Sequence, residues 1–172
     1  MKIRAALHLG LSSANLVLQS MPGETPERLL LKLAGYVFHF DKDPVVDPSL
    51  KHPALLGQEY APDLLVTDVT GAVSLWVECG KTTLHKLGKV SRRFHHARVI
   101  VLTARPHEGR QMAEGVSSEG IDRTEVWSFR EGDFERWADL VQEKNEIIGE
   151  ASETEMNLVL NAETFVTQLE KR

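Results

Sequence analysis

The sequence predicts an α/β (α+β) protein in which a mixed central sheet is flanked by helices. Short apolar runs with strand character alternate along the chain with stretches of helical spacing, which is the order typical of a sheet covered by helices. The 172 residues, 42% of them hydrophobic and 26% charged, fall within the size and composition of one globular domain. We therefore expect a single domain over residues 1–172.

The first third of the chain predicts a hairpin followed by a helix. Residues 3–9 and 16–19 are short, partly alternating runs separated by glycine, serine and asparagine. Thr25 is suited to cap a helix, Pro26 to open it, and apolar residues recur at helical spacing up to position 40. Residues 41–60 contain three prolines and no steady period, so we expect a loop with at most a short helical turn.

The rest of the chain predicts alternating strands and helices. Residues 61–80 read as two strands around a tight turn at 69–72, where Gly71 supplies the unusual φ. Asp68 beside this turn is expected to serve turn chemistry rather than to bind a ligand. Apolar spacing predicts helices over 82–94, 106–116 and 133–146 and strands over 98–103, 124–129, 156–160 and 164–169.

The net charge of −5 argues against a protein that coats nucleic acid through bulk electrostatics. The charges are nevertheless segregated, because residues 79–107 contain no Asp or Glu. A local site for a polyanion such as nucleic acid is therefore possible, although a solvated helix face explains the same residues. The candidate nucleic-acid contacts are Lys81, Lys86, Lys89, Arg92 and Arg93.

Other classes of protein are disfavoured by what the sequence lacks. Cys79 is the only cysteine, so no intrachain disulfide can form. No apolar run approaches the ~20 residues of a membrane helix and no leader is recognisable, so we expect a cytoplasmic protein without a membrane partner. The sequence contains neither of the glycine-rich phosphate-binding motifs GxGxxG and GxxxxGK(S/T), so a nucleotide cofactor is not expected.

The candidate site rests on two acids, Asp63 and Glu78, which are equidistant from the predicted turn. A hairpin would bring them together, and two adjacent carboxylates repel unless a cation lies between them. Mg²⁺ or Mn²⁺ would suit such oxygen ligands, with the main-chain carbonyl of Cys79 as a further one. A metal-bound water could then attack a phosphodiester, helped by a nearby lysine.

This spacing resembles the PD-(D/E)XK phosphodiesterase superfamily, and nearly the whole chain resembles the bacterial YaeQ family. The segments that carry the resemblance are ETPERLLLKLAGY, SLWVECG before a basic helix, EVWSF and NLVLNAETF. The resemblance implies a restriction-endonuclease-like core with an extra N-terminal hairpin and C-terminal strands. It also implies that Asp63 and Glu78 are the metal-binding acids and that Glu27 is a third acid of the site.

The sequence departs from the superfamily pattern at Gly80, where a lysine should stand. The lysine role is expected to have moved to the following helix, to Lys89 first and then Lys86, with Lys81 as an adjacent alternative. Two functions stay open. One is a Mg²⁺-dependent nuclease, and the other is a catalytically inactive protein that binds nucleic acid or protein. An open cleft holding both acids and a lysine would favour the first, and acids capped by salt bridges would favour the second.

Overall fold

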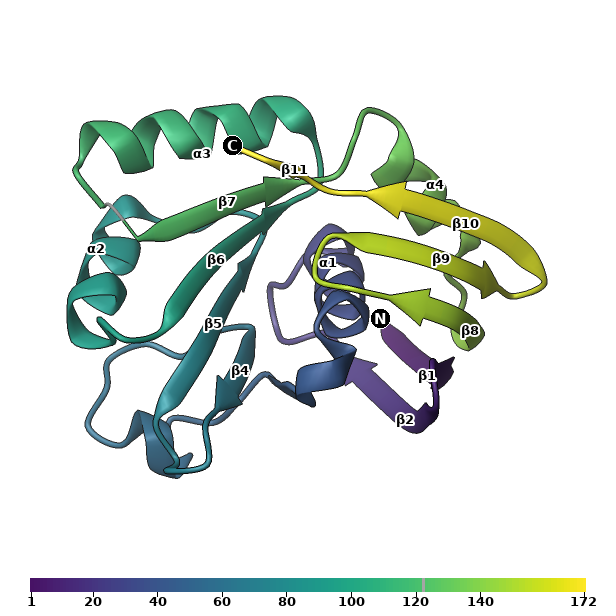
Figure 1. The fold of residues 1–172 in the computed structure, drawn as a ribbon, viewed down its shortest axis with the longest axis horizontal. Coiled ribbons are helices and arrows are strands. Elements are labelled where there is room, and N and C mark those ends of the chain that lie inside the picture. The colour runs from purple at the N-terminus through teal and green to yellow at the C-terminus, as the bar shows by residue number, and fades with distance from the viewer. Residues whose placement is uncertain (122) are drawn as a thin grey trace.

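The computed structural model describes residues 1–121 and 123–172, which form two mixed sheets (Figure 1). The first sheet has the order β10-β9-β8-β1-β2. Its strands are β1 (Lys2–Leu9), β2 (Ser12–Gln19), β8 (Lys144–Ala151), β9 (Glu155–Leu160) and β10 (Glu163–Gln168). The second sheet has the order β11-β7-β6-β5-β4-β3. Its strands are β3 (Val45–Val46), β4 (Leu64–Thr67), β5 (Val73–Cys79), β6 (Arg98–Thr103), β7 (Thr124–Ser128) and β11 (Glu170–Lys171).

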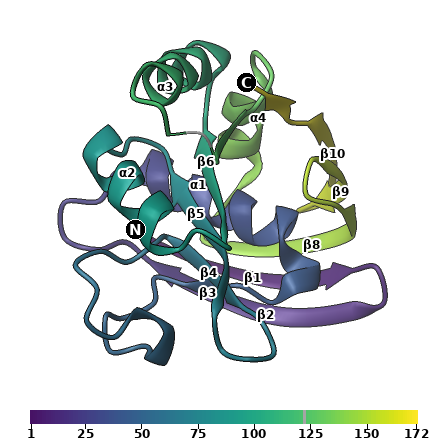
Figure 2. The ribbon, with the colours of Figure 1, turned by 60° about the vertical axis from the view of Figure 1, so that its left-hand side comes forward.

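Helix α1 (Pro26–Phe38) lies between the two sheets (Figures 1 and 2). Its residues from Leu29 to Phe38 are all buried, as expected for a helix with apolar neighbours on every side. Helices α2 (Leu84–Arg93) and α3 (Pro106–Ser118) cover the other face of the second sheet, while α4 (Asp133–Leu140) joins the core around α1. No helix among the described residues is long and apolar enough to cross a membrane.

The predicted fold class is confirmed, and so are both hairpins. Strands β1 and β2 pair in regular antiparallel register, and β4 pairs with β5 across the expected turn. The carboxylate of Asp68 accepts hydrogen bonds from the backbone N–H groups of Thr70 and Ala72, which is the turn chemistry expected of it. Helix α1 begins as predicted, because the Thr25 hydroxyl accepts from the Arg28 N–H at 3.2 Å.

One predicted helix is too long. The helix expected over 133–146 ends at Leu140, and residues from Lys144 form β8, which pairs with β1 and β9. The buried Asn145 stabilises the transition from helix to strand, because its side chain forms hydrogen bonds with the backbone of Gln142 and of Arg4. Strands β8, β9 and β10 therefore join the N-terminal hairpin in a separate sheet, whereas β11 at the end of the chain pairs with β7 of the second sheet.

The segment expected to be a loop has more structure than predicted. Two short 3₁₀ helices, Phe40–Lys42 and Pro53–Leu55, flank the two-residue strand β3, which pairs with β4. Strand β3 thereby forms the edge of the second sheet directly beside Asp63, whose carbonyl accepts from the Asp47 N–H at 2.9 Å.

Candidate functional site

The hairpin of β4 and β5 places Asp63 beside Glu78. The Asp63 N–H donates to the Val77 carbonyl at 3.0 Å, which continues the antiparallel register by one residue beyond β4. The Asp63 carboxylate in turn accepts from the Cys79 N–H at 2.7 Å. Asp63 is only 5% exposed and Glu78 1%, so both acids need partners inside the protein.

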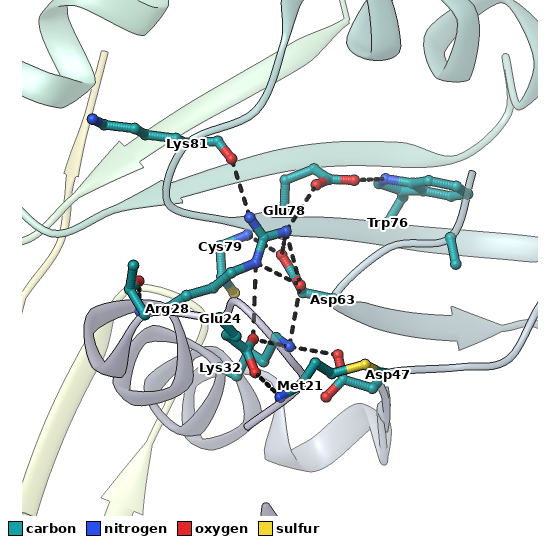
Figure 3. Close-up of polar contacts among 12 residues, drawn as sticks. Met21, Glu24, Arg28, Lys32, Asp47, Asp63, Trp76, Glu78, Cys79 and Lys81 are labelled. Atoms are coloured by element: carbon teal, nitrogen blue, oxygen red, sulfur yellow. Dashed lines mark hydrogen bonds and ion pairs between the residues drawn. The ribbon is translucent and has the colours of Figure 1, made fainter. Parts of the chain in front are cut away.

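Arg28 on α1 is the main partner of Asp63 (Figure 3). Its guanidinium donates to both carboxylate oxygens, from Nη2 at 3.1 and 2.8 Å and from Nε at 3.2 Å. The same Nη2 lies 3.8 Å from Glu78 Oε2, and Nη1 donates to the carbonyl of Lys81. Burial alone would lower the pKa of Arg28, but the charges of Asp63 and Glu78 raise it overall. Arg28 thus carries a fixed positive charge between the two acids.

Lys32, one helical turn further along α1, is almost completely buried among three acids. Its ammonium pairs with Glu24, lies 2.6 Å from Asp47 Oδ1 and lies 3.5 Å from Asp63 Oδ1. Burial opposes the charge of Lys32, but the hydrogen bonds to Asp47 and Glu24 raise its pKa overall. Burial raises the pKa of Asp47 in spite of this partner. Lys32 therefore stays charged and ties β3 to α1.

Glu78 points to the opposite face of the sheet, towards α2. Its Oε1 accepts from Trp76 Nε1 at 2.8 Å and pairs with Lys86 Nζ at 2.8 Å. Its Oε2 is buried and has no hydrogen bond among the described residues. Burial raises the pKa of Glu78, Lys86 opposes this shift, and the charge of Asp63 adds to it. Glu78 Oε2 thus has the Arg28 guanidinium as an ion-pair neighbour at 3.8 Å but accepts no hydrogen bond from a described residue.

The charges of this acid cluster nearly balance. The cluster has four acids and three cations, so its formal charge is −4 + 3 = −1. One proton on Glu78 would make it neutral, which is the cheaper state for a buried group. The members are Glu24, Arg28, Lys32, Asp47, Asp63, Glu78 and Lys86.

Lys86, and not the preferred Lys89, reaches the acids. Lys86 also donates to the carbonyl of Ala61 at 3.1 Å and is largely buried. Lys89 instead pairs with Glu59 at 2.9 Å on the surface. The two lysines are three residues apart on α2, so Lys89 lies one turn further from the end of β5 and is rotated away from it.

The side chains of two other residues assigned to the metal site point away from the acids. The Glu27 carboxylate accepts from Arg105 Nη1 at 2.8 Å, because Arg28 faces the acids and its neighbour on the helix must face away. The Cys79 side chain is buried on the α1 side of the sheet, and burial raises the pKa of its thiol well above the usual range. The backbone N–H of Cys79 donates to Asp63, and the role expected of its main-chain carbonyl stays a prediction.

The residues fit no divalent cation in this arrangement. No group of three or more His, Cys, Asp or Glu side chains among the described residues could hold a metal ion. Both carboxylates are already neutralised by Arg28, Lys32 and Lys86, and neither is open to solvent. The acids and a lysine converge as a catalytic site requires, but they are capped by salt bridges rather than placed in an open cleft.

The predicted nucleic-acid contacts divide into two groups. Lys86 belongs to the acid cluster and is withdrawn from the surface. Lys81, Lys89, Arg92 and Arg93 are exposed, and only Lys89 among them pairs with a described acid. The Lys81 side chain points away from the cluster, although its carbonyl contacts Arg28 (Figure 3).

Sequence reasoning missed Arg28, Lys32, Glu24 and Asp47. A signal for the first three was present: Arg28 and Lys32 are four residues apart on one face of a largely apolar helix, and Glu24 lies four residues before Arg28, just ahead of the cap at Thr25. Charged groups in a helix that is apolar all round need partners inside the fold. Asp47 gave no such signal, since its contact depends on how the loop folds back.

Fold and site together define an α+β protein with a buried cluster of ion pairs at one edge of a mixed sheet. The chain belongs to the YaeQ family: the family described as YaeQ protein matches residues 10–169. No curated protein matches the sequence.

Among the crystal structures that share the fold are two of YaeQ proteins. The YaeQ protein from Pseudomonas syringae is 17% identical with a TM-score of 0.75, and the alignment covers 99% of this chain and 94% of that one. The YaeQ protein from Xanthomonas axonopodis pv. citri is 18% identical with a TM-score of 0.70, and the coverage is 99% and 97%.

Proposed function

We propose that this protein binds nucleic acid without cutting it, on a scaffold related to the PD-(D/E)XK nucleases. The observation that carries this proposal is the position of Arg28, whose guanidinium contacts Asp63 in a bidentate manner and also approaches Glu78. A nuclease of this kind needs a metal ion between these acids, and here a side chain of the protein supplies the positive charge.

The binding surface in this proposal is the exposed basic side of α2 and the residues before it. Lys81, Arg92 and Arg93 pair with no described acid and are therefore available for phosphates. The stretch from 79 to 107 contributes no carboxylate that would repel a polyanion, and acids from other segments, Glu59 and Glu119, lie beside Lys89 and Arg92. Contacts of this type hold the phosphate backbone and do not select a sequence.

A metal-dependent phosphodiesterase is the second candidate, and one observation favours it. Glu78 Oε2 is buried without a hydrogen bond while Lys86 Nζ lies 2.8 Å from Oε1, so two acids and a lysine do converge. Mg²⁺ or Mn²⁺ would supply an activated water and neutralise phosphate charge when bound. In this candidate Arg28 must first leave Asp63, since it occupies both carboxylate oxygens.

Fluorescence anisotropy with labelled single-stranded and duplex DNA and RNA, over a range of salt concentrations, tests the proposal. We expect the triple variant Lys81→Gln, Arg92→Gln, Arg93→Gln to bind at least tenfold more weakly. The dependence of log K on log salt should flatten by about 2 to 3, because each lost phosphate contact contributes roughly 0.7–0.9.

The matched control removes three exposed lysines elsewhere, by Lys2→Gln, Lys51→Gln and Lys144→Gln. Equal losses in both variants would show attraction by overall charge alone and contradict the proposed surface. Cleavage of the same substrates is followed with and without Mg²⁺ or Mn²⁺. Metal-dependent cleavage that Asp63→Asn abolishes would establish the second candidate in place of the first.

A further inference from the structure

A separate pocket of about 230 Å³ opens at the carboxyl ends of β5 and β6. Its base is formed by Gly80 and Thr103, the residues at or just beyond the ends of these parallel strands. Its walls come from the first turns of α1 and α2 and from α3. Ligands of α/β proteins commonly bind at this edge of a sheet. The volume suits one flat ring system rather than a drug-sized molecule.

The walls of the pocket are mainly apolar. Leu84 at the start of α2 faces Met112 and Gly115 of α3. A Cβ atom at Gly115 would lie 3.0 Å from the Leu84 side chain, so the glycine allows α3 to lie directly against this leucine. Side chains of this type make contact with the faces of a ring and not with a strongly hydrated ion.

The polar groups of the pocket differ in whether they are already engaged. The carboxylates of Glu27 and Glu108 are both held by Arg105, at 2.8 Å and 3.1–3.3 Å. No hydrogen bond joins the Gln111 amide to another described residue, and no described acid pairs with Lys81. The pocket thus presents one free amide, which is both donor and acceptor, and one free cation at its rim.

The hollow continues along α2. A second groove shares Leu84 and is lined further by His85, Gly88, Arg92, Glu119 and Ile121, so that its one acid among the described residues, Glu119, lies in the same groove as Arg92. Leu84 and Arg92 are eight residues apart, which corresponds to about 12 Å along the helix. A nucleic-acid strand with one phosphate at Arg92 can therefore reach Lys81 and the pocket within a few nucleotides.

From these features we infer that the pocket takes one unstacked nucleobase of the bound strand, with its phosphate at Lys81. The base would lie between Leu84 and Met112 and turn its hydrogen-bonding edge to the Gln111 amide, a side chain that can pair with such an edge in two places. This inference rests on the proposed nucleic-acid binding and adds to it a preference for unpaired strands, because a paired base must first be extracted from its duplex.

The test compares a single-stranded 12-mer with a blunt duplex of the same sequence by anisotropy. Gln111→Ala removes the amide of an exposed residue, and Met112→Trp fills the pocket. We expect each variant to weaken single-strand binding at least fivefold and to change duplex binding less than twofold. Ser117→Ala, an exposed position on the same helix outside the pocket, should change neither.

The outcomes separate the two proposals. If Gln111→Ala and Met112→Trp both bind single strands as tightly as wild type, the base pocket is overturned. Weaker binding by the triple variant Lys81→Gln, Arg92→Gln, Arg93→Gln would still support the binding surface in that case. A preference of the wild type for duplex would also overturn the pocket. No binding of any nucleic acid by the wild type would overturn both. Thermal melts of each variant verify that Met112→Trp is folded.

Discussion

Replacing Arg28 by methionine tests whether the acid cluster is held together by the protein's own cations. The substitution keeps much of the aliphatic stem and removes the charge that contacts both oxygens of Asp63. Asp63 would retain the Cys79 N–H and the ammonium of Lys32 at 3.5 Å. The formal charge of the cluster would change from −1 to −2.

The expected loss of stability follows from the burial of the pair. Removing one partner of a buried ion pair costs about 3–5 kcal/mol. The Arg28 side chain is 31% exposed and Lys32 remains near Asp63, so water and a second cation lower this cost. We therefore expect a decrease of about 2–3 kcal/mol in the free energy of unfolding, which for a chain of this length lowers Tm by roughly 4–12 °C.

Urea denaturation of wild type, Arg28→Met, Asp63→Asn and the double variant measures the coupling. Once the Asp63 charge is gone, losing Arg28 should cost less, so the double variant should be more stable by at least about 1 kcal/mol than the sum of the single losses predicts. A single variant within 0.5 kcal/mol of wild type, or strict additivity, would refute the reasoning. Millimolar Mn²⁺ should raise the Tm of Arg28→Met and leave that of the wild type unchanged. A shift in the wild type that Asp63→Asn removes would favour the phosphodiesterase instead.

Three further predictions concern groups with unusual surroundings. Burial lowers the pKa of His39 from 6.5 to about 4, so between these values the unfolded chain binds more protons than the folded one and stability falls as pH falls. From this group alone the free energy of unfolding of wild type should decrease by about 3 kcal/mol between pH 7 and pH 4. In urea melts at the two pH values, His39→Leu should show a correspondingly smaller decrease. Equal losses in the two proteins would contradict this role. Burial raises the pKa of Glu78, so its charge costs stability as pH rises through that pKa. At pH 7 the free energy of unfolding of Glu78→Gln should therefore be higher than that of wild type or at most about 1 kcal/mol lower. A loss beyond about 2 kcal/mol in urea melts would show that the charge is needed. Gly149→Ala should unfold at least about 2 kcal/mol more easily because its Cβ atom would lie 2.2 Å from the Asn157 carbonyl, whereas Gly10→Ala, with open space around it, should cost only about 1 kcal/mol; similar Tm values for the two variants would be the contrary result.

The proximity of Asp63 and Glu78 was predictable, because a hairpin around Gly71 places the residues before β4 beside the end of β5. The exact pairing also depends on the irregularity between Val66 and Thr67. Beside the turn Thr67 pairs with Val73, and the irregularity shifts the register by one residue, so that Leu64 pairs with Val77 and position 63 faces position 78. The choice between Lys86 and Lys89 could not be made in the same way. It depends on the rotation of α2 about its axis, which is set by the cap at Thr83 and by packing on the sheet.

The missed strand β8 shows a different limit. Its sequence KNEIIGEA contains Lys and Glu residues that suit a helix surface, and alternating burial in the structure puts these charges on the solvent side of a strand. What decides the matter is pairing with β1, which is more than 130 residues away in sequence. Local propensity carries no information about a partner at that distance.

The departure at Gly80 has a structural explanation that also bears on function. Gly80 has φ +80°, a conformation that is strained for a lysine, and a Cβ atom there would already contact Leu31 at 3.4 Å. A cation for the acids therefore cannot come from this position without rearranging the end of β5. It comes from the two helices instead, with Arg28 of α1 contacting Asp63 and Lys86 of α2 contacting Glu78 from the other face of the sheet. Under the proposed function, Lys86 takes the place of the lysine expected at residue 80, and Arg28 occupies the carboxylate oxygens of Asp63 that a metal would need. Arg28 is thus the residue on which the proposal of binding without cleavage depends.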